Sequence, residues 1–167
     1  MLTMLTMTSP LGALRLFARM DELVGVYLPT QTAPAAPERS TPVLALAAAQ
    51  LTEYFAGRRT AFELPLAPAG TAFQQLVWRQ LAKIPFGETW SYGALARGIQ
   101  RPSASRAVGH ASSKNPISII VPCHRVVGAS GQLTGYAGGM VAKQWLLEHE
   151  QRHASGLPAG CAVLDAC

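Results

Sequence analysis

A proline-rich segment near the middle of the chain, Pro65-Leu-Ala-Pro-Ala-Gly70, separates two stretches with different apolar patterns. Proline lacks a backbone donor and fixes φ, so this composition interrupts both helices and sheets. The chain has 167 residues, of which 49% are hydrophobic, enough for one ordinary domain or two small ones. We therefore predict a first domain over residues 1–70, a second over 71–153 and a tail over 154–167.

The first domain is predicted to combine a short antiparallel sheet with one helix. Apolar residues over 14–18 and 23–28 indicate the two strands of a hairpin, whose turn lies at residues 20–22. Residues 29–41 are rich in Pro, Thr and Ala, so we expect an exposed loop there. Apolar residues at helical spacing then predict a helix over 43–55.

The second domain is predicted to be mainly helical. Thr71 is a suitable N-cap for a first helix, and Ser91 for a short second one. A third helix is expected over 104–114, because Asn115-Pro116 ends the helical pattern. The remaining expectations are a buried strand over 117–121, a glycine-rich hairpin or wing over 128–139 and a last helix over 140–153. Three helices followed by a hairpin are typical of a winged helix-turn-helix domain.

Charge is unevenly distributed between the two halves. Acidic and basic residues are equal in number over 1–70, whereas 71–153 carries nine Lys and Arg against three Glu, and the whole chain is +5. A positive domain favours a polyanionic partner such as nucleic acid. The helix over 104–114 supports this partner with its small residues and one long cation, Arg106, which could contact phosphate or insert among bases. The same residues would also suit tight helix packing, with Arg106 in solvent.

Cysteine content and hydropathy indicate the cellular setting. The three cysteines, Cys123, Cys161 and Cys167, form no disulfide framework, so we expect a reducing, cytoplasmic environment. No apolar run has the length of a membrane span, and the N-terminus lacks the basic start of a signal peptide. We therefore expect no membrane association.

The adjacent pair Cys123-His124 is the strongest candidate for chemistry. It follows the predicted buried strand, where a pocket can form, and an enclosed thiol beside a base can become a nucleophile. Taken alone, such a pair is more often a buried structural cysteine beside a surface histidine. A cysteine peptidase would combine Cys123 with His124 or His149 and with Asn115, but no peptidase motif surrounds Cys123.

A zinc peptidase is a further interpretation. His149-Glu150-Gln-Arg-His153 matches the HExxH pattern, in which two histidines bind zinc and the glutamate is the base. Such a site needs a third protein ligand, and only Asp165 and the tail cysteines follow. We instead expect Glu150 to orient a buried histidine, with His149 and His153 facing solvent.

Five ordered blocks resemble those of the O6-alkylguanine-DNA alkyltransferases, also called methylated-DNA–protein-cysteine methyltransferases, of the single-function bacterial type. The blocks are Arg106-Ala-Val-Gly109, Asn115-Pro116, Pro122-Cys-His-Arg-Val126, Gly135-Tyr-Ala-Gly-Gly139 and Lys143-x-Trp145-Leu-Leu-x-His-Glu150, and Tyr92 fits the pattern too. The similarity runs in register from about Thr71 to Glu150, whereas the first half matches loosely. It implies a ribonuclease-H-like α/β first domain, with a short antiparallel sheet and a helix, and a mainly α winged helix-turn-helix second domain.

The resemblance implies a self-inactivating DNA repair reaction. Cys123 would accept a methyl or other alkyl group from O6 of a flipped guanine, and O4 of thymine is a further candidate. His124 would be the base, acting through a water, and Glu150 would hold His124. Asn115 would brace the turn before the site, and Tyr92 would help rotate the nucleotide.

The resemblance also implies how DNA is bound. The partner is double-stranded DNA containing O6-alkylguanine, contacted through its minor groove by a monomer. Arg106 would fill the gap that the flipped base leaves in the stack. The other expected DNA-binding residues are Tyr92, Ala107, Ala111, Ser112 and Arg125, and the expected base-pocket residues are Val126, Tyr136 and Ala137.

Single features of the sequence distinguish this chain from two related classes of protein. Some family members bind zinc in the first domain, but no Cys or His precedes residue 110, so we expect no metal and no other cofactor. The alkyltransferase-like proteins bind lesions without repairing them and lack the reactive cysteine, so Cys123 favours transfer over binding alone.

Overall fold

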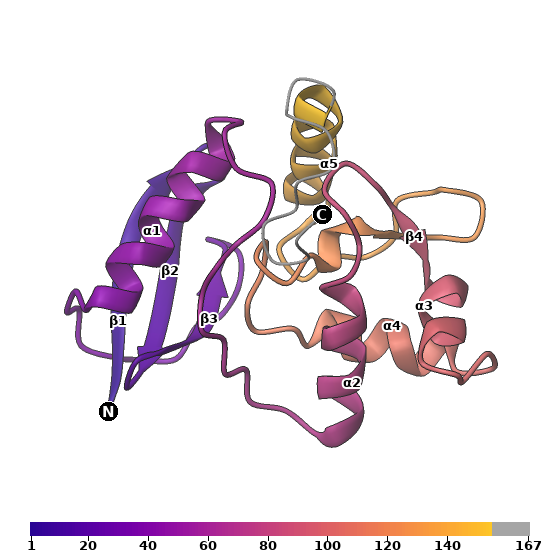
Figure 1. The fold of residues 1–167 in the computed structure, drawn as a ribbon, viewed down its shortest axis with the longest axis horizontal. Helices are drawn as coiled ribbons and strands as arrows, with labels where there is room; N and C mark the ends of the chain where they lie inside the picture. The colour runs from indigo at the N-terminus through magenta and orange to yellow at the C-terminus, as the bar shows by residue number, and fades with distance from the viewer. Residues whose placement is uncertain (155–167) are drawn as a thin grey trace.

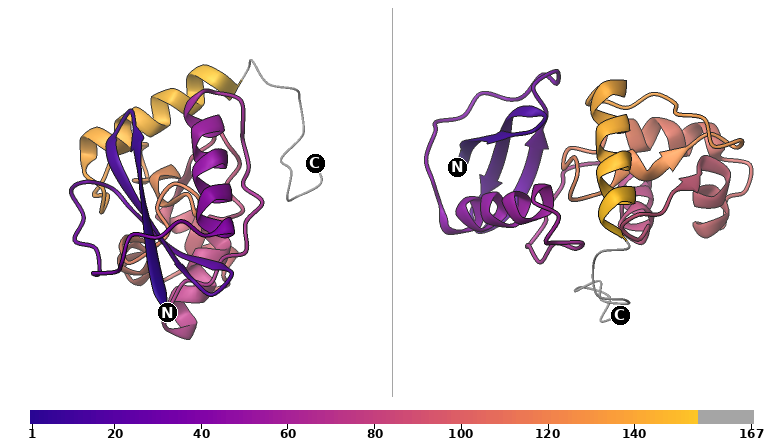
Figure 2. Two further views of the ribbon diagram at one scale, coloured as in Figure 1. Left: turned by 90° about the vertical axis from the view of Figure 1, so that its left-hand side faces the viewer. Right: turned by 90° about the horizontal axis from the view of Figure 1, so that it is seen from above.

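The structure, a computed structural model, describes residues 1–154, so the predicted tail lies almost wholly outside the described residues. The elements in chain order are β1 (Leu2–Ser9), β2 (Gly12–Arg19), β3 (Glu22–Tyr27), α1 (Pro42–Phe55), α2 (Ala72–Leu81), β4 (Trp90–Ser91), α3 (Tyr92–Gly98), α4 (Ser105–Ser113), the 3-10 turn η1 (Cys123–Arg125), β5 (Val126–Val127) and α5 (Met140–Ala154). The sheet and α1 lie on one side, α2, α3 and α4 on the other, and α5 lies between them (Figures 1 and 2).

The first half contains a three-stranded antiparallel sheet in the order β1-β2-β3, with α1 packed on it. The predicted hairpin is present as β2 and β3, and the predicted helix is present as α1, which is capped by the Thr41 side chain. Strand β1 was not predicted. It pairs with β2 from Leu2 to Ser9, but of its eight residues only Thr3 is buried, so its sequence lacks the apolar alternation that marks a half-buried strand.

The outer edge of β3 is covered by two segments from different parts of the chain. Leu23 donates to the carbonyl of Pro65 at 2.8 Å, so the proline-rich segment is bonded to the sheet rather than free. Val26 donates to the carbonyl of Pro116 at 2.9 Å and accepts from Ser118 at 3.2 Å. These bonds satisfy backbone groups that an edge strand would otherwise expose. They also attach the turn before Cys123 to the first half of the chain.

The second half is mainly helical. Thr71 caps α2 in a reciprocal capping box with Gln74, and Ser91 caps α3, both as predicted. The expected hairpin over 128–139 is wrong in detail, because this segment contains turns but no strand. Instead β4 and β5 form a two-residue parallel pair. The predicted fold class, a small antiparallel sheet with a helix followed by a mainly helical domain, is confirmed.

The predicted strand over 117–121 is also wrong. After one bridge to Val26 at Ile117, the chain turns through Ile119, whose φ is +73°, and Val121 donates back to the carbonyl of Ile117. The run is buried, as expected, but apolar content alone does not distinguish a strand from a buried turn. Within residues 1–154 no helix is both long and apolar enough to cross a membrane.

Candidate active site

Cys123 is the first residue of η1, directly after this buried turn. Its side chain is free and only 6% exposed. The Asn115 side chain, which is buried between α4 and the turn, donates to Cys123 Sγ at 3.2 Å. The predicted nucleophile is therefore positioned by a residue that also shapes its surroundings.

Asn115 organises the turn that leads to Cys123. Its Nδ2 donates to the carbonyls of Val121 at 2.9 Å and Ile117 at 3.3 Å, and its Oδ1 accepts from the amide of Ile117 at 3.0 Å. These bonds satisfy backbone groups that would pair with a neighbouring strand in a sheet. They explain why the β-branched run folds as a turn around Asn115.

Burial raises the pKa of the Cys123 thiol from 9.0 to about 11, although the Asn115 hydrogen bond and the charge of Lys143 act in the opposite direction. Lys143 is itself buried, and its ammonium donates to the carbonyl of Val126 at 2.5 Å and of Thr134 at 3.2 Å. Lys143 begins the last of the five sequence blocks, but no role was predicted for it. A thiol of this pKa is protonated at neutral pH and needs a base to react.

His124 is fully buried and has one side-chain partner. Its Nε2 lies 2.7 Å from Glu150 Oε2 on α5, and its Nδ1 has no protein partner within the described part of the chain. Burial lowers the pKa of His124 below its ordinary value, against the pull of Glu150. A neutral imidazole that donates from Nε2 keeps a lone pair on Nδ1, so His124 can accept a proton there.

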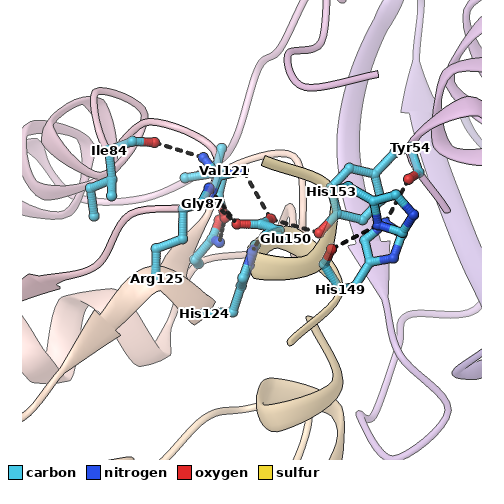
Figure 3. Close-up of polar contacts among 10 residues, drawn as sticks. Tyr54, Ile84, Gly87, Val121, His124, Arg125, His149, Glu150 and His153 are labelled. Carbon is cyan, nitrogen blue, oxygen red and sulfur yellow. Dashed lines mark hydrogen bonds and ion pairs between the residues drawn. The ribbon is translucent and has the colours of Figure 1, made fainter. Parts of the chain in front are cut away.

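Glu150 lies at the centre of a buried polar network (Figure 3). Arg125 donates to Oε1 at 2.8 Å through Nε and to Oε2 at 2.9 Å through Nη2. Tyr54 donates its hydroxyl to Oε2 at 2.6 Å. Burial alone would raise the pKa of Glu150, but His124 and Arg125 outweigh it and hold that pKa well below the ordinary value. The carboxylate therefore stays ionised as an acceptor.

Arg125 corrects one of the sequence predictions. We expected it among the DNA-binding residues, but only 5% of its surface is exposed. Besides Glu150, it donates from Nη1 to the carbonyl of Ile84 at 2.6 Å. A guanidinium enclosed in this way compensates a buried carboxylate and does not face a DNA surface.

His149 corrects a second sequence prediction. We expected it to face solvent, but it is 1% exposed, because its Nε2 lies 2.8 Å from the carbonyl of Tyr54 and its ring stacks on Trp145. His153 is half-buried and bonds to the carbonyl of His149 through Nδ1 at 2.8 Å. The three residues of the HExxH pattern, His149, Glu150 and His153, thus make separate internal contacts. In residues 1–154 no three His, Cys, Asp or Glu side chains converge as a metal site requires.

A small recess opens beside Cys123. Its lining brings together the predicted Tyr92, Cys123, Ser112, Tyr136 and Ala137, together with Gly109, Ser113 and Gly135. Tyr92 and Thr134 share a hydrogen bond at 2.9 Å between their hydroxyls. Val126, expected in the base pocket, is fully buried in β5 and does not line this recess.

Two family models match almost the whole described chain. The model for the "6-O-methylguanine DNA methyltransferase, ribonuclease-like domain" matches residues 3–68, and that for the "6-O-methylguanine DNA methyltransferase, DNA binding domain" matches residues 72–152. The chain belongs to the 6-O-methylguanine-DNA methyltransferase family. The resemblance inferred from the five sequence blocks is thereby confirmed, and so is the ribonuclease-like character expected of the first half.

Curated relatives and solved structures of this methyltransferase family agree with the assignment. A methylated-DNA–protein-cysteine methyltransferase of Mycolicibacterium paratuberculosis is 47% identical over 165 residues, which are 96% of this chain and 97% of the relative. The crystal structure of Mycobacterium tuberculosis OGT in complex with DNA is 46% identical, with a TM-score of 0.86 over 94% of this chain and 96% of that one. A structure of Mycobacterium tuberculosis O6-methylguanine methyltransferase has a TM-score of 0.85 at 44% identity over 99% of this chain and 100% of that one.

In this methyltransferase the helix α4 presents only part of its predicted DNA-binding set to solvent. Arg106 and Ala107 are exposed. Ala111 and Ser112 are buried, since the carbonyl of Ala111 accepts from Trp78 Nε1 at 2.9 Å and Ser112 lines the recess. Arg106 and Ala107 are thus the accessible members of the predicted set on α4, whereas Ser112 faces the recess beside Cys123.

Tyr54 is a site residue that, like Lys143, was given no role in the sequence analysis. It belongs to α1 in the ribonuclease-like domain, 96 residues before Glu150. Its sequence position fits the apolar face of a helix, and it is fully buried there. No local pattern distinguishes such a core tyrosine from one whose hydroxyl reaches a carboxylate in another domain.

Proposed function

We propose that this protein is a methylated-DNA–protein-cysteine methyltransferase that repairs DNA by moving a methyl or other alkyl group from O6 of guanine to its own Cys123. The observation that carries the proposal is the free Cys123 thiol at the recess, held by Asn115 and followed by the buried His124–Glu150 pair. The 47% identity to proteins named for this activity supports the same chemistry.

The reaction is a displacement at the alkyl carbon. The Cys123 sulfur forms a bond to that carbon as the carbon–O6 bond breaks, and the electron pair stays on O6. The thiol proton passes through a water to His124 Nδ1, the lone-pair atom that no protein group occupies within the described residues. The departing guanine takes up one proton at its ring, for which the Tyr92 hydroxyl at the recess is the proposed donor. The product is a thioether, so each molecule reacts once.

The thiol pKa and the His124 environment fit this sequence of steps. At neutral pH a thiol with a pKa of about 11 is almost wholly protonated, which protects it from unrelated electrophiles. His124 is neutral, since burial lowers its pKa, and is therefore ready to accept the proton. Ionised Glu150 then stabilises the imidazolium that forms.

The DNA partner is proposed to be a duplex containing O6-alkylguanine, bound by a monomer through its minor groove. A base must leave the stack to reach Cys123, at a cost on the order of a few kcal/mol. Arg106, exposed near the start of α4, is placed to fill the gap. The small residue Ala107 beside it lets the helix approach the groove. O4 of thymine is a further proposed alkyl donor.

Two points of organisation complete the proposal. We infer that residues 1–70 and 71–153 are separate domains, which the family models over 3–68 and 72–152 support. A thiol that must remain reduced in order to react suits a reducing compartment, so we place the protein in the cytoplasm.

The proposal is tested by incubating the protein with duplex DNA that carries methyl-labelled O6-methylguanine. We expect up to one label per protein molecule, located on Cys123 by peptide mapping, because the thioether is stable. Cys123→Ser should abolish labelling, whereas the paired substitution of Cys161 and Cys167 by serine should leave it unchanged.

Three outcomes separate the competing functions. DNA binding without any label would indicate a lesion-binding protein and contradict transfer. Chelator-sensitive cleavage of peptides would instead indicate a zinc peptidase. Label at Cys161 or Cys167 would show that Cys123 is not the acceptor.

A further inference from the structure

The Glu150 carboxylate receives one donor from outside the DNA-binding domain. The Tyr54 hydroxyl, on α1 of the ribonuclease-like domain, donates to Glu150 Oε2 at 2.6 Å (Figure 3). The same oxygen accepts from His124 Nε2 at 2.7 Å and from Arg125 Nη2 at 2.9 Å. Tyr54 and His124 therefore compete for the electron density of a single carboxylate oxygen.

The position of Tyr54 is held from several sides. Its side chain is fully buried, and its ring packs against Phe62 and Phe86. Its carbonyl lies 2.8 Å from His149 Nε2, one residue before Glu150 on α5. Burial first, and Glu150 next, raise the pKa of Tyr54 well above its ordinary value, so its hydroxyl remains a donor at any pH of interest.

We propose that Tyr54 is a positioning residue through which the ribonuclease-like domain tunes His124, the base of the DNA-binding domain, by way of Glu150. The inference rests on the proposed function of Cys123 and His124. A carboxylate oxygen that shares its charge among three donors attracts the His124 proton less strongly than one with two donors. Tyr54 thus keeps Glu150 from making His124 too basic, so that the imidazole stays neutral and available.

The other ionisable groups facing His124 come from three segments. Glu150 and Lys143 approach from α5, Arg125 from η1, and the Tyr136 ring from the loop before α5. Lys143 and Arg125 disfavour the imidazolium, whereas Glu150 favours it. Tyr54 is the donor to Glu150 that comes from the first domain and carries no charge, so its hydroxyl can be removed without changing the net charge of the site.

The test is the pH dependence of Cys123 methylation in Tyr54→Phe. The rate constant is measured with labelled O6-methylguanine DNA from about pH 5 to about pH 9. The acid limb of the pH–rate profile is where His124 becomes protonated. We expect it to move to higher pH by about half a pH unit to one pH unit. The rate then falls roughly three- to ten-fold on that limb and is unchanged at high pH, because only the protonation of His124 differs.

Two comparisons separate tuning from a structural effect. Tyr27→Phe removes a hydroxyl from β3 of the same domain, where the ring packs on Phe17, and should leave the profile unchanged. Tyr54→Phe added to Glu150→Gln should cause no further shift beyond Glu150→Gln alone, since Tyr54 acts through the carboxylate. A Tyr54→Phe profile that superimposes on the wild-type profile would overturn the inference, and so would a further shift in the double variant.

A second variant, expected to shift the acid limb in the opposite direction, tests the inference if Tyr54→Phe fails to fold. Site-specific 3-fluorotyrosine at position 54 keeps the ring and makes the hydroxyl a stronger donor, so the acid limb should move to lower pH. Movement to higher pH, or no movement, would contradict the inference. Wild-type protein without label on Cys123 would refute the proposed function as well, whereas labelled protein with unchanged profiles would refute this inference alone.

Discussion

Cys123 is a thiol enclosed by its own turn, and its protonation is coupled to the stability of the fold. Burial raises the pKa of the folded thiol from 9.0 to about 11. Between these values the unfolded chain loses the proton while the folded chain retains it. The unfolded state therefore gains stability relative to the folded state as the pH rises through this window.

From this coupling we predict that Cys123 costs stability in alkaline solution. The free energy of unfolding of the wild type, relative to Cys123→Ala, should fall by about 2–3 kcal/mol between about pH 9 and about pH 11. The comparison cancels the contribution of the buried Tyr54, which is common to both proteins and whose pKa does not depend on Cys123. Urea unfolding at a series of pH values measures the difference, and a constant difference would contradict the raised pKa.

At the scale of elements, the hairpin between β2 and β3 carries an avoidable strain. Its two-residue turn, Met20-Asp21, places Met20 at a φ of +56°, whereas Asp21 is not among the described residues with positive φ. Hairpin turns of this kind favour glycine at the first central position, because glycine adopts positive φ without a steric cost. The Met20 side chain is 81% exposed and adds little packing.

We predict that Met20→Gly stabilises the protein by about 0.5–1 kcal/mol, since it relieves the strained conformation without losing core contacts. Asp21→Gly serves as the matched control. It should destabilise by about 0.5 kcal/mol, because it adds chain entropy to the unfolded state with no strain to relieve. Thermal and urea unfolding report both changes, and the same sign for both variants would count against the explanation.

The turn around Asn115 shows how an element departs from its apolar pattern. Sequence periodicity predicted a strand over 117–121, and the burial of this run was predicted correctly. The Ser118 amide still bonds to Val26 of β3, but the Ile117 amide and the carbonyls of Ile117 and Val121 bond to the Asn115 side chain. Local propensity could not show this, because the choice depends on where a single amide side chain is held.

At the scale of the whole molecule, the two halves are joined by a continuous apolar core and by polar contacts. The buried cluster includes residues of α1 and of the sheet together with residues of α2, α3 and α5. Thr30 donates to the carbonyl of Gly138 at 2.9 Å, and Tyr54 reaches Glu150 at 2.6 Å. Such an interface favours cooperative unfolding of the two halves.

We predict a single unfolding transition for the molecule. All three Trp residues lie in the second half, although Trp145 also contacts Phe55 of α1, and far-ultraviolet circular dichroism reports both halves. If the halves unfold together, the fluorescence and circular dichroism curves should coincide. Leu44 is buried in the core beneath α1. Leu44→Ala should therefore lower the free energy of unfolding measured by fluorescence by about 2–5 kcal/mol. Leu46→Ala on the same helix, where the side chain is 46% exposed, should shift it little. A shift confined to circular dichroism would show independent domains.

Much of the fold was predictable, because capping residues and apolar spacing act locally. Thr71 and Ser91 were recognised as helix caps, and the helix over 43–55 followed from its spacing. Strand β1 and the parallel pair β4–β5 were not predicted, since pairing partners distant in sequence define them. Among the site residues, Arg125 and His149 were placed at the surface although they are buried, because charge alone does not reveal an internal partner.

The sequence by itself determined the family, the acceptor Cys123 as a candidate, and the order of the main helices, since motifs and periodicity are properties of the chain. Only the tertiary structure decided how the site is held. The donors to Glu150 include Tyr54 from 96 residues away and Arg125 from 25 residues away. Hydrogen bonds depend on distances of about 3 Å in space, which sequence separation does not encode. The hydrogen bond between Tyr54 and Glu150 therefore forms only when both halves of the chain are folded together.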